Sequence, residues 1–125
     1  MLARSVLLAL TLLLAGCAGP RDPAVVTFMT DNRTTTVWTV NFQVLAPNGS
    51  LVFDETYTAT SSKLQTFDNM TFPARTYQAS FRANTQFGAT RQTISDGLVM
   101  GLVGPGSLVA ILDPAKPTLE FRPAS

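Results

Sequence analysis

Residue types that carry catalysis are sparse in this chain of 125 residues. It contains no histidine and one cysteine, Cys17, so the commonest general bases, metal ligands and thiol nucleophiles are almost absent. Asp54-Glu55 is the only adjacent acidic pair. Because neighbouring residues on a strand point to opposite faces, we expect the two carboxylates to diverge and to be solvated.

The remaining polar residues give no stronger signal. Ser61-Ser62-Lys63 and Ser95-Asp96 lack a histidine partner, and a serine–lysine hydrolase would need more context than these short runs offer. The other aspartates lack the spacing of a calcium loop and stand at turn-like positions, where aspartate commonly caps its own backbone: Asp31, Asp68, Asp96 and Asp113. The sequence therefore predicts no catalytic residue, no metal site, no cofactor and no enzyme.

The N-terminus has the order of an export signal. Arg4 precedes an apolar run from Val6 to Leu14, broken only by Thr11, and small residues follow this run. A charged segment, an apolar segment and a small-residue cleavage zone are the three parts of a signal peptide. The apolar run is shorter than the ~20 residues that a spanning helix needs, so we expect residues 1–16 to be a cleaved signal helix.

Leu14-Ala15-Gly16-Cys17 resembles the lipobox of prokaryotic membrane lipoproteins. The resemblance implies cleavage between Gly16 and Cys17 and a thioether-linked diacylglycerol on Cys17. One acyl chain anchors a protein only marginally, whereas two chains hold it without a transmembrane helix. The alternative is an ordinary secretory signal that ends in these letters by chance.

The anchor would place the protein on the extracytoplasmic side of a cell membrane. In a two-membrane bacterium, the resemblance implies export to the outer membrane, because Ala18 stands where an aspartate would favour retention. Residues 17–24 form a lipidated cysteine and a short tether. Its seven residues after Cys17 reach at most ~23–25 Å, so the following domain would stay close to the bilayer.

Removal of residues 1–16 leaves 109 residues, which is enough for one domain with its own core. It also removes Arg4, so eight basic and eight acidic side chains remain and the mature chain is neutral. A neutral chain offers no electrostatic footprint for nucleic acid and no polybasic patch for anionic lipid.

The pattern from residue 25 onward favours strands. Between Trp38 and Val44 apolar residues alternate with polar ones, which is typical of a strand with one buried face. Asn48-Gly49 follows, a strong hairpin signal, and the alternation resumes at Leu51. Further short strands are expected, separated by turn signals that include Ser95-Asp96-Gly97. We predict an all-β fold: a single antiparallel β-sandwich of about seven to eight strands over residues 25–125.

Residues 64–83, LQTFDNMTFPARTYQASFRA, resemble a strand–turn–strand motif of immunoglobulin-like, transthyretin-like and carboxypeptidase-regulatory-like sandwiches. Pro73-Ala74-Arg75-Thr76-Tyr77 stands where these families have a Gly-Thr-Tyr-Thr-Val type strand, without its glycine. The resemblance implies an immunoglobulin-like fold class and no particular activity.

Residues 97–112, GLVMGLVGPGSLVAIL, carry no charge and one polar side chain, Ser107. One interpretation is a pair of strands buried on both faces around a Gly-Pro-Gly-Ser turn. The other is an exposed apolar surface for a lipid, a ligand or a partner. The residues that would form this surface are Leu98, Met100, Leu102, Leu108 and Ile111.

Three asparagines begin N-x-Ser/Thr sequons and are candidate N-glycosylation sites: Asn32, Asn48 and Asn69. The alternative is that asparagine is simply frequent at turns.

Two functions remain open. The first is a lipid-anchored cell-envelope sandwich that acts as a structural or protein-interaction module, with the membrane and an envelope protein as its partners. The second is a binding protein for an apolar small molecule or lipid, which uses residues 97–112 and the aromatic strand around Trp38 and Phe42. A cavity between the sheets would favour the second function, and a filled core would remove it.

Overall fold

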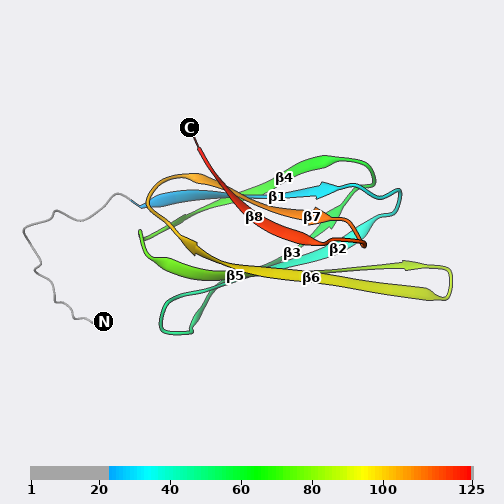
Figure 1. The fold of residues 1–125 in the computed structure, drawn as a ribbon, viewed down its shortest axis with the longest axis horizontal. Helices are drawn as coiled ribbons and strands as arrows, with labels where there is room; N and C mark the ends of the chain where they lie inside the picture. Colours follow the sequence, from blue (N-terminus) through cyan, green and yellow to red (C-terminus); the bar gives the residue numbers. More distant parts are fainter. Residues whose placement is uncertain (1–22, 125) are drawn as a thin grey trace, which may run out of the picture.

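The computed structural model describes residues 23–124, which form eight strands (Figure 1). The predicted signal peptide, the Gly16–Cys17 cleavage site and most of the tether lie outside this range. Residues 23–124 contain no helix, and so none that is long and apolar enough to cross a membrane. The strands are β1 Ala24–Asn32, β2 Trp38–Leu45, β3 Leu51–Ala59, β4 Leu64–Phe72, β5 Thr76–Phe87, β6 Thr90–Gly101, β7 Gly106–Leu112 and β8 Thr118–Pro123.

The strands form two sheets of four, which confirms the predicted all-β sandwich. The first sheet has the order β4-β1-β7-β8, and the second has the order β3-β2-β5-β6. All neighbours are antiparallel except β1 and β7, which run parallel. In the constant-type immunoglobulin order the first two strands share a sheet. Here β1 and β2 lie in opposite sheets, so the connectivity is a different one.

The β2–β3 hairpin forms around Asn48-Gly49 as the sequence predicts, with Gly49 at a positive φ of 88°. The turn expected at Ser95-Asp96-Gly97 is wrong, because these residues lie in the middle of the twelve-residue strand β6. β6 pairs along its whole length with β5, and the turn between them is at Gly88-Ala89. Beyond Asn84 the strand β5 has no pairing with β2, so the end of this hairpin projects past the other strands (Figure 1).

The core lies between the two sheets and centres on Phe28 of β1. The Phe28 ring stacks on Phe53 at a centroid distance of 4.1 Å and meets the edge of Phe42 at 5.4 Å. All three side chains are buried and come from both sheets. Burial of one such side chain contributes about 1.5–3 kcal/mol, so this aromatic contact holds the sheets together without a disulfide.

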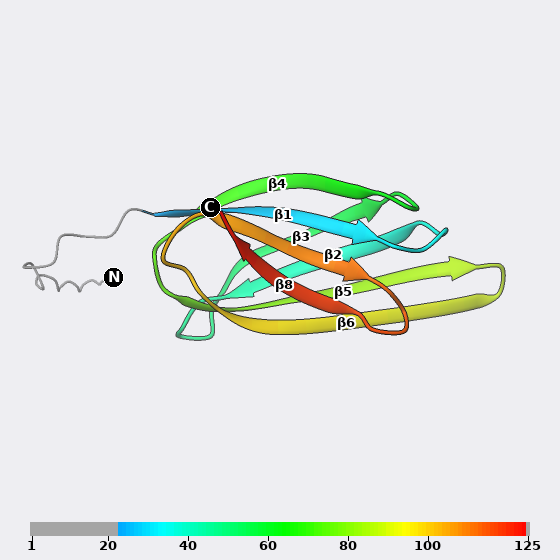
Figure 2. The ribbon, with the colours of Figure 1, turned by 45° about the horizontal axis from the view of Figure 1, so that its top comes forward.

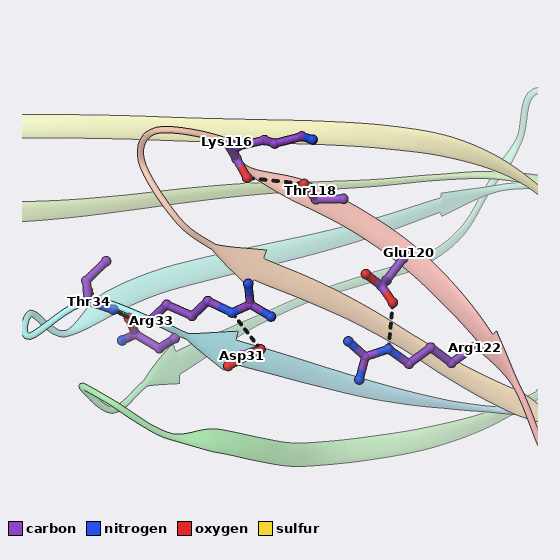
Figure 3. A network of polar contacts seen from close by, with 8 residues as sticks. Asp31, Arg33, Thr34, Lys116, Thr118, Glu120 and Arg122 are labelled. Atoms are coloured by element: carbon purple, nitrogen blue, oxygen red, sulfur yellow. Dashed lines mark hydrogen bonds and ion pairs between the residues drawn. The ribbon is translucent and has the colours of Figure 1, made fainter.

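β7 is buried on both of its faces, as expected for a central strand with a parallel neighbour. Leu108, Ala110 and Leu112 belong to the inter-sheet core. Val109 and Ile111 point to the outer face and are buried as well. Two ion pairs lie on the strands that flank β7 (Figure 3). Asp31 at the end of β1 pairs with Arg33 at 3.0 Å, and Glu120 pairs with Arg122 within β8 at 2.6 Å.

A polar cluster around Asn32 ties β1 to the start of β2 and the end of β3. The Asn32 side chain is 2% exposed, and its Nδ2 donates to the carbonyls of Thr36 at 2.8 Å and Thr60 at 3.0 Å. Its Oδ1 accepts from the Thr34 hydroxyl at 2.7 Å, and that hydroxyl oxygen accepts from Trp38 Nε1 at 2.8 Å. Because buried polar groups must be paired, this cluster fixes the 33–37 connection.

Tyr77 closes the crossover from β4 to β5. Its hydroxyl donates to the Pro73 carbonyl at 2.7 Å, which spans the connection at residues 73–75. Immunoglobulin-type sandwiches have a tyrosine corner of the same kind, in which a tyrosine hydroxyl bonds to the backbone a few residues upstream. The contact lies within the segment whose sequence resembles these sandwiches.

Each strand crosses the sandwich once, so the connections alternate between its two ends (Figure 2). The end where β1 starts and β8 finishes we call the tether end. Backbone hydrogen bonds join its connections: Leu102 N–H donates to Arg75 O, and Ala124 N–H donates to Pro105 O, both at 2.9 Å. The connections at this end are 46–50, 73–75 and 102–105. Those at the opposite, distal end are 33–37, 60–63, 88–89 and 113–117.

Replacement of Asn32 with alanine should lower the free energy of unfolding by about 2–3 kcal/mol. The substitution leaves the carbonyls of Thr36 and Thr60 and the Thr34 hydroxyl without the Asn32 side chain as their partner. Such a loss inside the protein costs more than the loss of an exposed hydrogen bond. Urea unfolding followed by Trp38 fluorescence measures the change. Asn48→Ala, in an exposed turn, is the matched control and should change stability far less; equal losses in the two variants would contradict the role of the cluster.

The two tyrosines give a second prediction, for high pH. Burial raises the pKa of Tyr57 above its ordinary value of 10.0, and the negative charges of Asp68 and Glu55 raise it further. Burial also raises the pKa of Tyr77, with Arg75 acting against it. The free energy of unfolding should therefore be independent of these groups below pH 10 and fall as the pH rises above 10, since the unfolded chain ionises first.

Absorbance at 295 nm should report both tyrosine midpoints above 10. Tyr57→Phe should reduce the fall in stability above pH 10. An unchanged pH dependence in that variant, with midpoints at the ordinary value, would show that the Tyr57 ring is not buried in this way.

Candidate functional site

Several acidic side chains have structural partners, and the acidic residues of the described chain do not gather into a reactive centre. Asp96 Oδ2 accepts from Leu119 N–H at 2.8 Å, which joins the edges of β6 and β8. Asp113 caps the backbone of Ala115 in its own turn. Asp54 Oδ1 accepts from the Asn41 amide at 2.7 Å. In residues 23–124 no three His, Cys, Asp or Glu side chains come close enough together to hold a metal ion.

The predicted apolar surface in residues 97–112 is not exposed. Met100, Leu102 and Leu108 lie in the core between the sheets, and Ile111 is buried on the outer face of β7. Leu98 is half-buried and packs against the core, and the other four are buried: Met100, Leu102, Leu108 and Ile111. The interpretation of this stretch as strands buried on both faces holds for β7, whereas β6 buries one face only. Only Val99 and Val103 within it are large, apolar and exposed, at 67% and 79%.

The three sequons differ in the accessibility of their amides. Asn48 is exposed in the β2–β3 turn, where its Oδ1 accepts from Ser50 N–H, and Asn69 is exposed on the edge strand β4. The Asn32 amide nitrogen is buried and donates to backbone carbonyls. Asn32 is therefore the least accessible of the three candidate sites, because a glycan on Nδ2 would break these hydrogen bonds in the folded chain.

A continuous depression lies instead on the outer face of the second sheet. Three hollows of about 370, 500 and 610 Å³ open there and share lining residues. Gln78 and Val99 line two of them, and Ser80 and Gly97 also line two. We call the combined depression the β5 trough. It follows the outward residues of β5 between β2 and β6: Thr76, Gln78, Ser80 and Arg82.

The floor of the β5 trough is low because its central residues are small. Ser80 and Gly97 are direct cross-strand partners, and Gly97 has no side chain. A Cβ at Gly97 would lie 3.2 Å from the Ala79 carbonyl oxygen, so even alanine would crowd the β5 backbone. Longer side chains stand on either side in β2 and β6: Asn41, Gln43, Leu45 and Val99. The pairing of two small residues between longer ones produces the trough.

The chemistry of the trough changes along its length. Near the tether end it is lined by Leu45 and Val99 beside Gln78. Further along β5 it is lined by amides, hydroxyls and one guanidinium: Asn41, Gln43, Ser80, Ser95 and Arg82. Asp96 also lines this part, but its carboxylate accepts a hydrogen bond from β8. An extended ligand could therefore place an apolar group at one end and hydrogen-bonding groups at the other.

Charged side chains lie on the strands of both sheets, but few of them line the trough. The first sheet carries the ion pairs Asp31–Arg33 and Glu120–Arg122 on or beside its strands (Figure 3). The trough lining includes only Arg82 and the engaged Asp96 among charged residues. Charged side chains are depleted at the centres of protein interfaces, whereas arginine is enriched there. The lining of the trough therefore has a composition that suits the centre of an interface.

The sequence did not predict the β5 trough as a site, although two of the residues singled out from the sequence, Leu98 and Asn48, line it. The available signal was Gly97, since a glycine inside a strand often marks a close approach of the backbone. Its neighbours Ser95-Asp96 are frequent in turns, so the three residues were expected to end a strand, and the pairing of Gly97 with Ser80 could not be seen.

Comparison of the chain with protein-family models, with curated proteins and with solved structures found no match.

Proposed function

We propose that the protein is a lipid-anchored cell-envelope module that binds a protein partner through the β5 trough. The observation that carries the proposal is the position of the three hollows, which share lining residues on the outer face of the second sheet instead of lying between the sheets. Their volumes fall in the range of ligand sites, and their elongated arrangement along β5 suits an extended segment of a partner.

The anchor rests on the lipobox resemblance at Leu14–Cys17. A diacylglycerol on Cys17 would hold the sandwich within reach of the tether, at most ~25 Å from the bilayer. The residues that precede Ala24 join the sandwich at the tether end. The outer face of the second sheet runs along the side of the sandwich, so a partner in the same envelope could approach it without displacing the anchor.

The second function, binding of an apolar small molecule or lipid between the sheets, has less support. It needs a cavity in the core, and the inner faces are filled by side chains of both sheets, including Trp38 and Phe42. The five residues predicted to form the apolar surface pack in or against the protein interior.

Filling the trough should abolish partner binding. Ser80→Trp places a large ring on the floor that two hollows share. A loss of about 2 kcal/mol, the size of a hot-spot contact, corresponds to about thirtyfold in affinity. Crosslinking of the full chain in native membranes, followed by quantitative recovery of the stoichiometric partner, measures the effect.

Thr66→Trp, exposed on β4 of the first sheet, is the matched control and should leave recovery unchanged. Both variants should unfold at the same urea concentration as the unmodified chain. Equal recovery of the partner with both variants would overturn the assignment of the trough, because the added bulk would then be irrelevant to binding.

Cys17→Ser tests the anchor. Without the sulfur no diacylglycerol can be attached, so the variant should retain its uncleaved signal or appear in the soluble fraction, and intact mass should show the loss of the lipid. A Cys17→Ser chain that is processed, membrane-bound and equal in lipid mass to the unmodified chain would rule out lipidation at this residue.

A further inference from the structure

The exposed apolar side chains of the sandwich are distributed unevenly between its two ends. Eight large apolar residues are exposed in residues 23–124. Two of these, Val37 and Leu64, belong to the distal end. The other six lie in or within four residues of the tether-end connections and chain ends, and we call them the tether rim: Val25, Leu51, Val52, Met70, Val99 and Val103.

Val103 stands out within the tether rim. It lies in the 102–105 connection between β6 and β7 and is 79% exposed, the highest value among the eight. Its neighbour Leu102 is buried, and Gly104 and Pro105 complete the connection. This connection has no charged residue and belongs to the uncharged stretch 97–112, so a loop with an apolar tip faces outward at this end.

Charge follows the opposite distribution. The three connections at the tether end contain one charged residue, Arg75, and no acidic one. The distal connections contain four charged residues: Arg33, Lys63, Asp113 and Lys116. Connections with an apolar tip, one arginine and no acidic residue are compatible with a bilayer that carries anionic headgroups, although Asp54, Glu120 and Arg122 lie within four residues of this end.

The tether end is also the end to which the proposed anchor is attached. β1 starts there at Ala24, and only six residues lie between Cys17 and Ala24. The tether is thus long enough to let this end reach the bilayer and too short to let the domain move far away.

We propose that the tether end, with Val103 at its tip, rests on the membrane surface as a second contact beside the lipid on Cys17. This inference depends on the proposed lipid anchor. Two acyl chains already hold the chain, so the added contact mainly sets its orientation. The sandwich would stand on its tether end, and the β5 trough would face sideways along the membrane.

A fluorophore on a single introduced cysteine tests this contact in the full lipidated chain, since the Cys17 sulfur is blocked by its thioether. Val103→Cys and Val37→Cys carry the same environment-sensitive NBD label. They are bound to vesicles of phosphatidylethanolamine and phosphatidylglycerol that contain nitroxide-labelled acyl chains. Label at position 103 should be quenched at least threefold more than label at position 37.

The outcomes separate the contact from the anchor. Flotation of both labelled chains with equal, weak quenching would overturn the membrane contact and leave the anchor standing. Failure of the chains to float with the vesicles would overturn the anchor and, with it, the contact.

Transfer of the unlabelled chain between vesicles tests the same contact without a fluorophore. The rate of transfer of the lipidated chain from donor to acceptor vesicles should rise roughly tenfold for Val103→Asp, because a charge replaces a valine that enters the interface. Val37→Asp, an exposed valine at the distal end, is the matched control and should transfer at the rate of the unmodified chain. Equal rates for the two variants would overturn the contact.

Discussion

The whole molecule depends on the burial of one face of each sheet against the other. Phe28 makes this contact from β1, where it meets Phe42 and Phe53 of the opposite sheet. The only cysteine of the chain lies outside the sandwich, so packing and hydrogen bonds alone hold the domain together. Side chains alternate between the inner and outer face along each strand, and this decides which of them remain for the outer faces.

The same constraint separates three surfaces. The first sheet covers the buried Val109 and Ile111 with polar neighbours and ion pairs. The second sheet leaves small residues, Ser80 and Gly97, paired on its outer face, and a trough results. Because each strand crosses the sandwich once, the connections divide into a tether end, poor in charge, and a polar distal end. The trough meets the tether end at Val99 and the 46–50 connection, and the distal end lies at the opposite side of the sandwich.

Local patterns in the sequence predict much of this fold. The alternation from Trp38 to Val44 and the Asn48-Gly49 turn define the β2–β3 hairpin, because period-two burial and a positive φ are local properties. The class of fold followed from the number of such strands. Pairing between distant strands could not be predicted. The parallel β1–β7 pair and the placement of β1 and β2 in different sheets depend on tertiary packing. Whether residues 97–112 were core or surface was undecidable for the same reason.

The candidate site was less accessible to prediction than the fold. Ser95, Asp96 and Gly97 have the composition of a turn, and only their pairing with β5 shows that they continue a strand. Asn32 matches a sequon, and only its burial reveals that the amide holds the 33–37 connection. In both cases a residue's local preference was overridden by contacts with residues far away in the chain.

Photo-crosslinking in native membranes tests the central claim most directly. A photoreactive amino acid at Gln43, beside the β5 trough, should give one discrete adduct with a single envelope protein in the membrane fraction. The same group at Thr66, on the first sheet, should give none. Adducts of equal yield from both faces, or no adduct from Gln43 in membranes where the chain is anchored, would contradict a module that binds its partner through the second sheet.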